Sequence, residues 1–572
     1  MKSIHISCDA LIIGGGSAGM WSAKRIKELD PSSRVVIVDK GAVKWGGLMS
    51  HSGGDFEAVM PDENVNDWVR DAVYYWDGLC EQDIMEDIYA KTYDRLCDYK
   101  SMGCEYLTDD EGNMRGVPQR GLAHCKLYPT KFKGTGGETM ARLMMEQMDR
   151  LGVEYISRIQ ITELIKRDDR VIGAVGFDYV TGDFVSAAAR VVILAAGPAS
   201  WKPGYNGNTS TGEWVELAFR AGAKLRNFDT LTVMNAPRRF FWEGQAVYLA
   251  IGARFVNASG EDFMRRYSPT LGSDTDNCYI CRAMALEMHK GNGPIYLDLS
   301  GVSMENMDLV EPNAGSQFLN YNKLRDEGID FLHDKNVEFI PQVQLTSGGI
   351  AADINGWTGV DGLFCAGRCR SLDYMYMGGF GLSSSAVTGY IAGESAAELL
   401  SGGRDLIEPD KETLETYRGK IFAPLGKRGR PPANVLDSLN RLLAHYDVCL
   451  IQSEESLKAA LMELDRIERE EITAMGAEDT HYLMKYYEVR GIAFLTRLFL
   501  LASLERRESR GSHFRLDYPE RDDRFLGWIT HVRDAGGGIH TGFERVPVEK
   551  YKNPIDKYYT DNFNFQIELG RE

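Results

Sequence analysis

Two adjacent arginines, Arg238 and Arg239, stand between a proline and a group of aromatic residues in the segment VMNAPRRFFWEG, residues 233–244. A guanidinium group is costly to place beside apolar rings unless an anion, a partner or water compensates its charge. Neighbouring side chains of an extended strand point to opposite sides, so at most one of the two arginines can face a substrate. Two interpretations stay open: an arginine stabilises negative charge on a substrate oxygen, or one caps a helix while the other pairs with a surface carboxylate.

A glycine-rich turn near the start of the chain predicts that a dinucleotide binds there. In DALIIGGGSAGMWSAKRI, an apolar strand leads into Gly14, Gly16 and Gly19 with the spacing GxGxxG, and a helical pattern follows. These glycines permit a tight turn and let the backbone approach a pyrophosphate at the helix N-terminus. A second apolar strand, RVVIVDK, ends at Asp39, and an acidic residue at this distance can bind ribose hydroxyls.

Further segments favour FAD over NAD as the dinucleotide. The stretch GAVKWGGLMSHSGGDFEAV could lay backbone against a flat ring system, and the strands in RVVILAAGPAS (190–200) and DGLFCAGRC (361–369) end in glycine turns. Strands so far apart that return to one nucleotide suit the long FAD molecule, and no second GxGxxG follows a strand. The predicted FAD-binding residues are Gly14, Gly16, Ser17, Ala18, Gly19, Asp39, Lys40, Gly46, Gly47, Gly53, Gly54, Ala195, Ala196, Gly197, Gly212, Glu213, Gly367, Arg368, Gly381, Leu382 and Ser383.

Composition limits the class of protein. A chain of 572 residues is too long for one hydrophobic core, so two or three domains are expected. The net charge of −18 argues against a general nucleic-acid binder, and no run is long and apolar enough to insert into a membrane. The N-terminus enters a strand pattern without a cleavage site, which predicts a cytoplasmic protein. Of ten cysteines only Cys278 and Cys281 have CxxC spacing, so we expect reduced thiols and no metal site.

Several motifs resemble those of the flavoprotein subunits of the fumarate reductase and succinate dehydrogenase superfamily, which includes adenylylsulfate reductase α subunits. The matching segments span nearly the whole chain in the family's order: IIGGGSAGM, ILAAGPAS, TSTGEWVELAFRAGA, FVNASGEDFMRRY, TSGGIAADINGWTGVDGLFCAGRC, GYIAGESAA and RRESRGSHFRLDYPERDD. The resemblance implies an α/β fold: a Rossmann-like FAD-binding domain, an inserted α+β capping domain and a C-terminal helical domain. We expect the FAD-binding domain at 1–230 and 346–405, the capping domain at 231–345, the helical domain at 406–535 and an arm at 536–572.

The residues with which the family binds small dicarboxylates are replaced in this sequence. Fumarate and succinate enzymes hold their dianions with paired His and Arg donors. The resemblance places Ala236 where the family has the His of its HPTG segment, Gln344 at the second His, and Tyr376 at the Arg of NRLGGN. A further catalytic Arg is replaced by Asn277, with Arg282 the nearest arginine. This pattern predicts a substrate other than fumarate or succinate.

We therefore take Arg238, Arg239, Arg282 and Tyr376 as candidate catalytic residues, with weaker candidates in Tyr374, Lys131, Lys133, Gly378, Gly379 and His289. In many succinate dehydrogenases a His just before a QGG-like element attaches to the flavin. Here that position is Gly47, and His51 is out of register, so we expect non-covalent FAD, with a link at His51 as the alternative.

The first functional hypothesis is a cytoplasmic FAD-dependent oxidoreductase that exchanges electrons between flavin N5 and a small anionic substrate, a compound with an activated C=C bond or a sulfur–oxygen compound. Without an NAD(P)H domain, electrons would pass through a ferredoxin-like iron–sulfur partner, and we also allow for an oligomer. One alternative is an enzyme like the adenylylsulfate reductase α subunit, although the chain is short for that group. The other is a non-catalytic subunit that relays electrons through FAD.

Overall fold

The first apolar strand lies inside a mixed sheet, where it pairs in parallel with a buried strand on each side. The structure is a computed structural model that describes residues 2–43, 45–131, 135–202, 210–238, 248–249, 251–303, 328 and 337–565. The sheet has the order β6-β2-β1-β9-β8-β7, and β16 pairs with β9. Its strands are β1 (Ser3–Ile13), β2 (Val35–Val38), β6 (Glu154–Ile156), β7 (Ile159–Arg167), β8 (Arg170–Asp178), β9 (Phe184–Leu194) and β16 (Leu363–Cys365). Pairing is parallel from β6 to β9 and to β16, whereas β7 and β8 pair antiparallel. The Rossmann-like prediction is confirmed.

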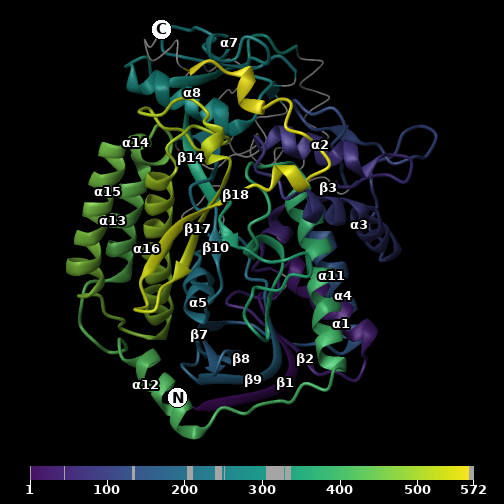
Figure 1. The fold of residues 1–572 in the computed structure, drawn as a ribbon, viewed down its shortest axis with the longest axis vertical. Coiled ribbons are helices and arrows are strands. Elements are labelled where there is room, and N and C mark those ends of the chain that lie inside the picture. Colours follow the sequence, from purple (N-terminus) through teal and green to yellow (C-terminus); the bar gives the residue numbers. More distant parts are fainter. Residues whose placement is uncertain are drawn as a thin grey trace.

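Two helices cover one face of this sheet and approach each other closely. They are α1 (Ser17–Leu29) and α11 (Phe380–Ser401), which run side by side at the right of Figure 1. A Cβ added at Gly389 or Gly393 of α11 would overlap the backbone oxygens of Ala18 and Ser22 in α1. The glycines of the GYIAGESAA segment therefore allow this close packing. Helix α3 (Gln82–Ser101) packs against α11 and α4 (Gly136–Leu151) against α1, while α2 (Val65–Tyr75) packs on α3 and α5 (Glu213–Ala221) on β7.

A separate antiparallel sheet lies between the two stretches of the FAD-binding region. It has the order β11-β14-β13-β12, and the buried helix α8 (Asn277–His289) packs against β11 and β14. The strands are β11 (Leu231–Pro237), β12 (Arg254–Val256), β13 (Ile295–Asp298) and β14 (Glu338–Thr346), and a short helix, α7 (Met264–Tyr267), precedes α8. We call this unit the cap; it forms the upper part of Figure 1.

A bundle of helices follows α11 and lies at the left of Figure 1. Its members are α12 (Lys411–Phe422), α13 (Pro432–Ala444), α14 (Tyr446–Cys449), α15 (Glu454–Arg466) and α16 (Thr480–Glu505). The predicted helical domain also contains a strand, since β17 (Gly527–Arg533) joins a sheet of order β15-β10-β17-β18. The other members of that sheet are β10 (Leu225–Arg226), β15 (Gly349–Ile350) and β18 (Ile539–Arg545). Within the described residues, no helix is both long and apolar enough to cross a bilayer.

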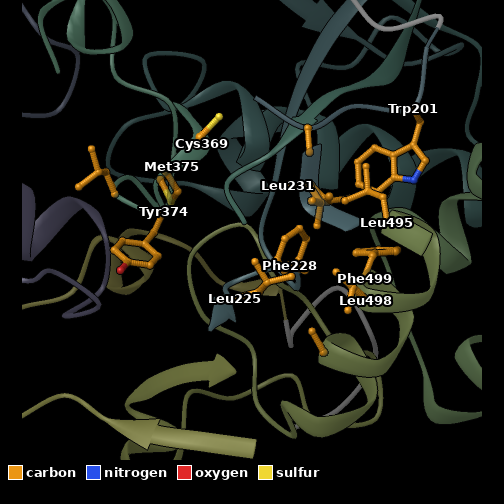
Figure 2. Close-up of a cluster of buried hydrophobic side chains, with 14 of the residues drawn as sticks. Trp201, Leu225, Phe228, Leu231, Cys369, Tyr374, Met375, Leu495, Leu498 and Phe499 are labelled. Atoms are coloured by element: carbon orange, nitrogen blue, oxygen red, sulfur yellow. The ribbon is translucent and has the colours of Figure 1, made fainter. Parts of the chain in front are cut away.

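Side chains from several of these units share one core. Figure 2 shows Leu495, Leu498 and Phe499 of α16 beside Trp201, with Phe228 close by. The rings of Trp201 and Phe499 meet edge to face with centroids 5.9 Å apart. This packing ties the C-terminal bundle to the FAD-binding region, so the bundle helps to hold the site in place.

The run 505–524 is dense in charged residues, which ordinarily form ion pairs in solvent, but several of its charged side chains are buried. Arg506 and Arg510 both bind the carboxylate of Glu508 at 2.9 Å, and all three side chains are at most 1% exposed. Arg506 also pairs with the fully buried Asp229. Charge density in the sequence alone does not reveal which charged groups find buried partners.

Candidate functional site

A cavity of about 1390 Å³ opens at the carboxyl ends of β1 and β2 and extends to the cap. Gly14 and Asp39, which follow those strands, line one part of it. Met234 of β11 and Gln344 of β14 line another part. One cavity therefore joins the predicted dinucleotide site to the cap. Ligands of open parallel sheets bind at this edge.

Most of the residues predicted to bind FAD come together in this cavity. Those that line it are Gly14, Gly16, Ser17, Ala18, Asp39, Lys40, Gly46, Gly47, Gly53, Ala195, Ala196, Gly197, Gly212, Glu213, Arg368, Gly381 and Leu382. Their segments are up to several hundred residues apart in the sequence. A cavity of this volume, lined by such distant segments, suits a dinucleotide of the size of FAD.

The cradle fits a bound pyrophosphate. Helix α1 begins at Ser17, so its unpaired backbone N–H groups face the cavity, where they favour an anion. Gly16 leaves space, because a Cβ added there would meet only the Cα of Gly47, 3.9 Å away. Asp39 is held by the backbone N–H groups of Gly15 and Gly41, which donate to its two carboxylate oxygens at 2.5 and 2.6 Å. Its position at the cavity wall is thereby fixed.

Four predicted FAD-binding residues do not line the cavity, and three of them are glycines packed behind it. A Cβ at Gly19 would overlap the carbonyl oxygen of Gly14, a Cβ at Gly54 would lie 2.6 Å from Gly136, and one at Gly367 would lie 2.7 Å from Ala18. These glycines shape the turns that carry the cradle. The fourth, Ser383, is fully buried, and its hydroxyl donates to the carbonyl of Phe380 at 3.1 Å.

A charged network that the sequence did not predict closes one end of the cavity. Lys40 donates to Glu213 at 2.8 Å and to Glu488 of α16 at 2.9 Å, and Lys202 donates to Glu488 at 3.0 Å. Burial alone would raise the pKa of Glu488, but Lys40 and Lys202 hold it at about 2. Lys202 and Glu488 are more than 280 residues apart, so only the fold reveals the pair.

The cap end of the cavity is poor in charge. Asn277, Gln344 and Tyr376 line it, and these are three of the four positions at which the family resemblance places His or Arg donors. Ala236, the fourth, is buried in β11 and is not part of the lining. Asn277 accepts a hydrogen bond from Asn235 at 3.1 Å, and apolar side chains fill the space between the polar groups. The apolar lining here includes Met234, Leu345 and Met377.

A tyrosine and an aspartate form the adjoining wall. The hydroxyl of Tyr75 lies 2.6 Å from Oδ2 of Asp276 and 2.8 Å from the carbonyl oxygen of Tyr376. Burial and the Asp276 carboxylate raise the pKa of Tyr75 well above its usual value, so this hydroxyl stays protonated. Asp276 also caps α8, because its Oδ1 accepts from the backbone of Cys278 at 2.7 Å.

The structure does not bring Arg238 or Arg282, the two predicted arginines that it describes, into the cavity. Arg238 lies just after β11 with 63% of its side chain exposed and binds both carboxylate oxygens of Glu338, at 3.0 and 3.1 Å. This arrangement matches the interpretation of a surface ion pair. Arg282 is buried, donates to the carbonyl of Gly511 at 2.7 Å and contacts the ring of Phe514. Arg239 lies outside the described residues.

The weaker candidates divide between the cavity and the core. His51, Lys131, Gly378 and Gly379 line the cavity, and Lys133 lies outside the described residues. Tyr374 does not line it; its ring packs against Trp76 with centroids 5.7 Å apart. His289 is in the last turn of α8, away from the lining.

Two polar groups in the lining were missed because they lie in loops without a motif. Arg120 follows the short strand β4 (Val117–Pro118), which pairs with β5 (Lys126–Tyr128). Asp55 precedes β3 (Phe56–Glu57), and burial raises the pKa of its carboxyl. Gln119 donates to the carbonyl of Gly378 and so ties the Arg120 segment to the loop before α11. No periodicity marks these residues, since each is positioned by pairing between distant segments.

Two family models match the chain. A model described as "FAD binding domain" matches residues 9–383, and one described as "Fumarate reductase flavoprotein C-term" matches residues 439–559. Among curated proteins, the chain is 26% identical to the fumarate reductase flavoprotein subunit of Mycobacterium tuberculosis, covering 96% of this chain and 99% of that protein. It is 26% identical to L-aspartate oxidase of Yersinia pestis, covering 93% and 99%.

Solved structures share the fold. A chain of E. coli quinol fumarate reductase superposes with a TM-score of 0.86 at 21% identity, covering 97% of this chain and 99% of that one. Adenylylsulfate reductase from Archaeoglobus fulgidus gives a TM-score of 0.81 at 20% identity, covering 96% and 98%. These likenesses confirm the expected α/β fold.

Proposed function

Because the chain belongs to the fumarate reductase and succinate dehydrogenase family of flavoproteins, we propose that it is an FAD-dependent oxidoreductase whose substrate is a small anion other than fumarate or succinate. FAD, when bound, supplies two-electron transfer at N5 of its ring system. The FAD-binding match and the oxidoreductases among the relatives support the cofactor and the class of reaction.

One observation carries the proposal on the substrate. The cavity keeps the glycine cradle at one end, while Asn277, Gln344 and Tyr376 replace charged donors at the other. Two carboxylates buried against neutral amides and apolar side chains would lose hydration without each gaining a charged partner. A four-carbon dianion is therefore poorly held.

Different residues of the chain would bind FAD and orient the substrate. The N-terminus of α1 and Asp39 line the cavity where they would hold the pyrophosphate and ribose of FAD. The amides of Asn277 and Gln344 line the cap end of the cavity, where they would orient the substrate. The Tyr75 hydroxyl, kept protonated beside Asp276, is placed to hold a proton at the cavity wall.

We propose non-covalent FAD and an iron–sulfur partner protein. The sequence offers Gly47 rather than His at the family's attachment position, while His51 lies elsewhere on the cavity wall. Relatives named as subunits support a larger assembly, and the sequence contains no second dinucleotide motif through which NAD(P)H could donate electrons.

The experiment is anaerobic reduction of the FAD-loaded protein, followed by addition of single oxidants. We expect an aryl acrylate or a sulfur–oxygen compound such as adenylylsulfate to restore the oxidised flavin spectrum, and fumarate to leave it reduced. Reoxidation by fumarate at a rate typical of an enzyme would refute the proposed substrate class. Reoxidation by iron–sulfur proteins alone would replace the proposal with the electron-relay alternative.

A further inference from the structure

Within the described residues, one partly buried cationic side chain of the cavity has no anionic partner. Six described lysines and arginines line the cavity: Lys40, Arg115, Arg120, Lys131, Lys202 and Arg368. Lys40 and Lys202 pair with Glu488, Lys131 lies 3.5 Å from Glu105, and Arg368 pairs with Asp373. Arg115 is exposed at the rim. This leaves Arg120.

The guanidinium of Arg120 has a hydrogen-bond donor that no described group satisfies. The residue is half-buried, its Nη1 atom is shielded from solvent, and within the described part of the chain this atom has no hydrogen-bond partner. A buried donor without a partner is costly, and for a charged group the cost is larger. Because Arg120 lines the cavity, a small rotation of its side chain would bring this donor to an anionic ligand group, and the charge-assisted hydrogen bond formed would remove that cost.

Arg120 lies at the cap side of the cavity, where a substrate would bind. The adjacent Gly121 packs on Tyr559, since a Cβ at Gly121 would lie 3.1 Å from that ring. The Tyr559 hydroxyl in turn lies 3.1 Å from the backbone nitrogen of Asp276, at the start of α8. Arg120 is also close enough to lower the pKa of Tyr559, which burial raises. The segment is therefore anchored beside the residue that precedes Asn277.

The Asp276 carboxylate does not neutralise this arginine. Its two oxygens are engaged by the backbone of Cys278 and by the hydroxyl of Tyr75, and no ion pair links it to Arg120 among the described residues. The remaining lining at this end is apolar or carries neutral amides. A ligand held here has one cation for one negative charge, and a second carboxylate would be desolvated without compensation.

We propose that Arg120 binds the single carboxylate of a monocarboxylate substrate whose remaining part is apolar. This inference rests on the proposed function and names its substrate class. Met234, Leu345 and Met377 accommodate the apolar part, and the amides of Asn277 and Gln344 contact any polar group along it. Arg120 thereby takes the place that Arg238 cannot fill from the surface.

The test measures binding, not turnover, by calorimetric titration of the oxidised FAD-loaded protein. The probes are cinnamate, its neutral analogue cinnamamide, and fumarate. Cinnamate is expected to bind more tightly than cinnamamide and fumarate. R120Q is expected to weaken cinnamate binding about 10- to 100-fold and to change cinnamamide binding less than about twofold. R120K, which keeps the charge but loses the two-pronged geometry, is expected to fall between wild type and R120Q.

The matched control is R265Q, because Arg265 is also on the cap side of the chain but its side chain is 82% exposed and, among the described residues, it pairs only with Asp262, at 3.2 Å. It should leave cinnamate binding unchanged. FAD content and the thermal midpoint of each variant show that it is folded and loaded. Cinnamate that binds no better than fumarate, or equally well to R120Q and wild type, would overturn the inference. Because no turnover is required, a failure to reoxidise the reduced flavin would count against the proposed function alone.

Discussion

Replacing Gly16 by alanine tests where the pyrophosphate of FAD binds. Gly16 precedes α1 with φ of −80° and ψ of −168°, a conformation that alanine adopts without strain. The new methyl group would meet only Gly47 Cα at 3.9 Å, so it fits the protein without FAD. It projects into the space in which the backbone should approach the pyrophosphate.

The expected loss of FAD affinity follows from the added methyl group, which overfills the contact between the backbone and the pyrophosphate. One extra carbon in a fitted interface costs about 1–3 kcal/mol, which corresponds to roughly 5- to 150-fold weaker FAD binding. The free energy of unfolding of the FAD-free protein should change by less than about 1 kcal/mol, because the loss at the helix start is offset by reduced freedom of the unfolded chain. Fluorescence titration of FAD into the apoprotein gives the affinity, and chemical denaturation gives the stability.

Gly14 provides the contrasting variant. Its φ of +114° is unfavourable for alanine, and a Cβ there would overlap the carbonyl oxygen of Ala195. Gly14→Ala should therefore lower the stability of the FAD-free protein itself by about 2 kcal/mol or more. If Gly16→Ala binds FAD as tightly as wild type, the pyrophosphate does not lie against Gly16 and the reasoning fails.

Three further predictions concern stability and the cofactor link. Burial lowers the pKa of His531 in the folded protein to about 4, whereas in the unfolded chain its pKa is near 6.5. As the pH falls, this histidine is therefore protonated first in the unfolded chain, which stabilises that state. The protein should be about 2 kcal/mol less stable at pH 5 than at pH 7 for this reason. In His531→Phe, the free energy of unfolding, measured by denaturation at several pH values, should fall less between pH 7 and pH 5 than in wild type. An equal fall in both proteins would contradict the assignment. Glu488→Gln leaves the charges of Lys40 and Lys202 partly uncompensated. It should lower the free energy of unfolding by about 2–3 kcal/mol, a value already reduced for the partial exposure of the two lysines. An unchanged free energy of unfolding would show that the network does not stabilise the fold. Acid precipitation of the FAD-loaded protein should release FAD into the supernatant equally for wild type and His51→Ala, whereas flavin retained only by wild type would reveal a covalent link.

Local sequence patterns predicted those parts of the site that are formed by residues close together in the sequence. The GxGxxG turn and Asp39 could be recognised because a strand, a turn and a helix N-terminus follow one another within a few residues. The family resemblance likewise identified Asn277, Gln344 and Tyr376, which line the cavity.

The rest of the site depends on contacts between distant segments. Arg120 acquires its environment from Tyr559, more than 400 residues later, and Glu488 reaches Lys40 only when α16 packs on the FAD-binding region. The aromatic neighbours of Arg238 suggested a binding role, but the pairing of β11 with β14 places Glu338 beside it. Sequence proximity could not distinguish a surface ion pair from a substrate contact.

The most direct test is anaerobic addition of succinate to the oxidised, FAD-loaded protein while the flavin absorbance is recorded. We predict that the spectrum stays unchanged with succinate and bleaches fully with dithionite, since the cradle holds FAD but the cap lacks charged donors for two carboxylates. Bleaching by succinate would contradict the claim that this cavity no longer holds a four-carbon dianion.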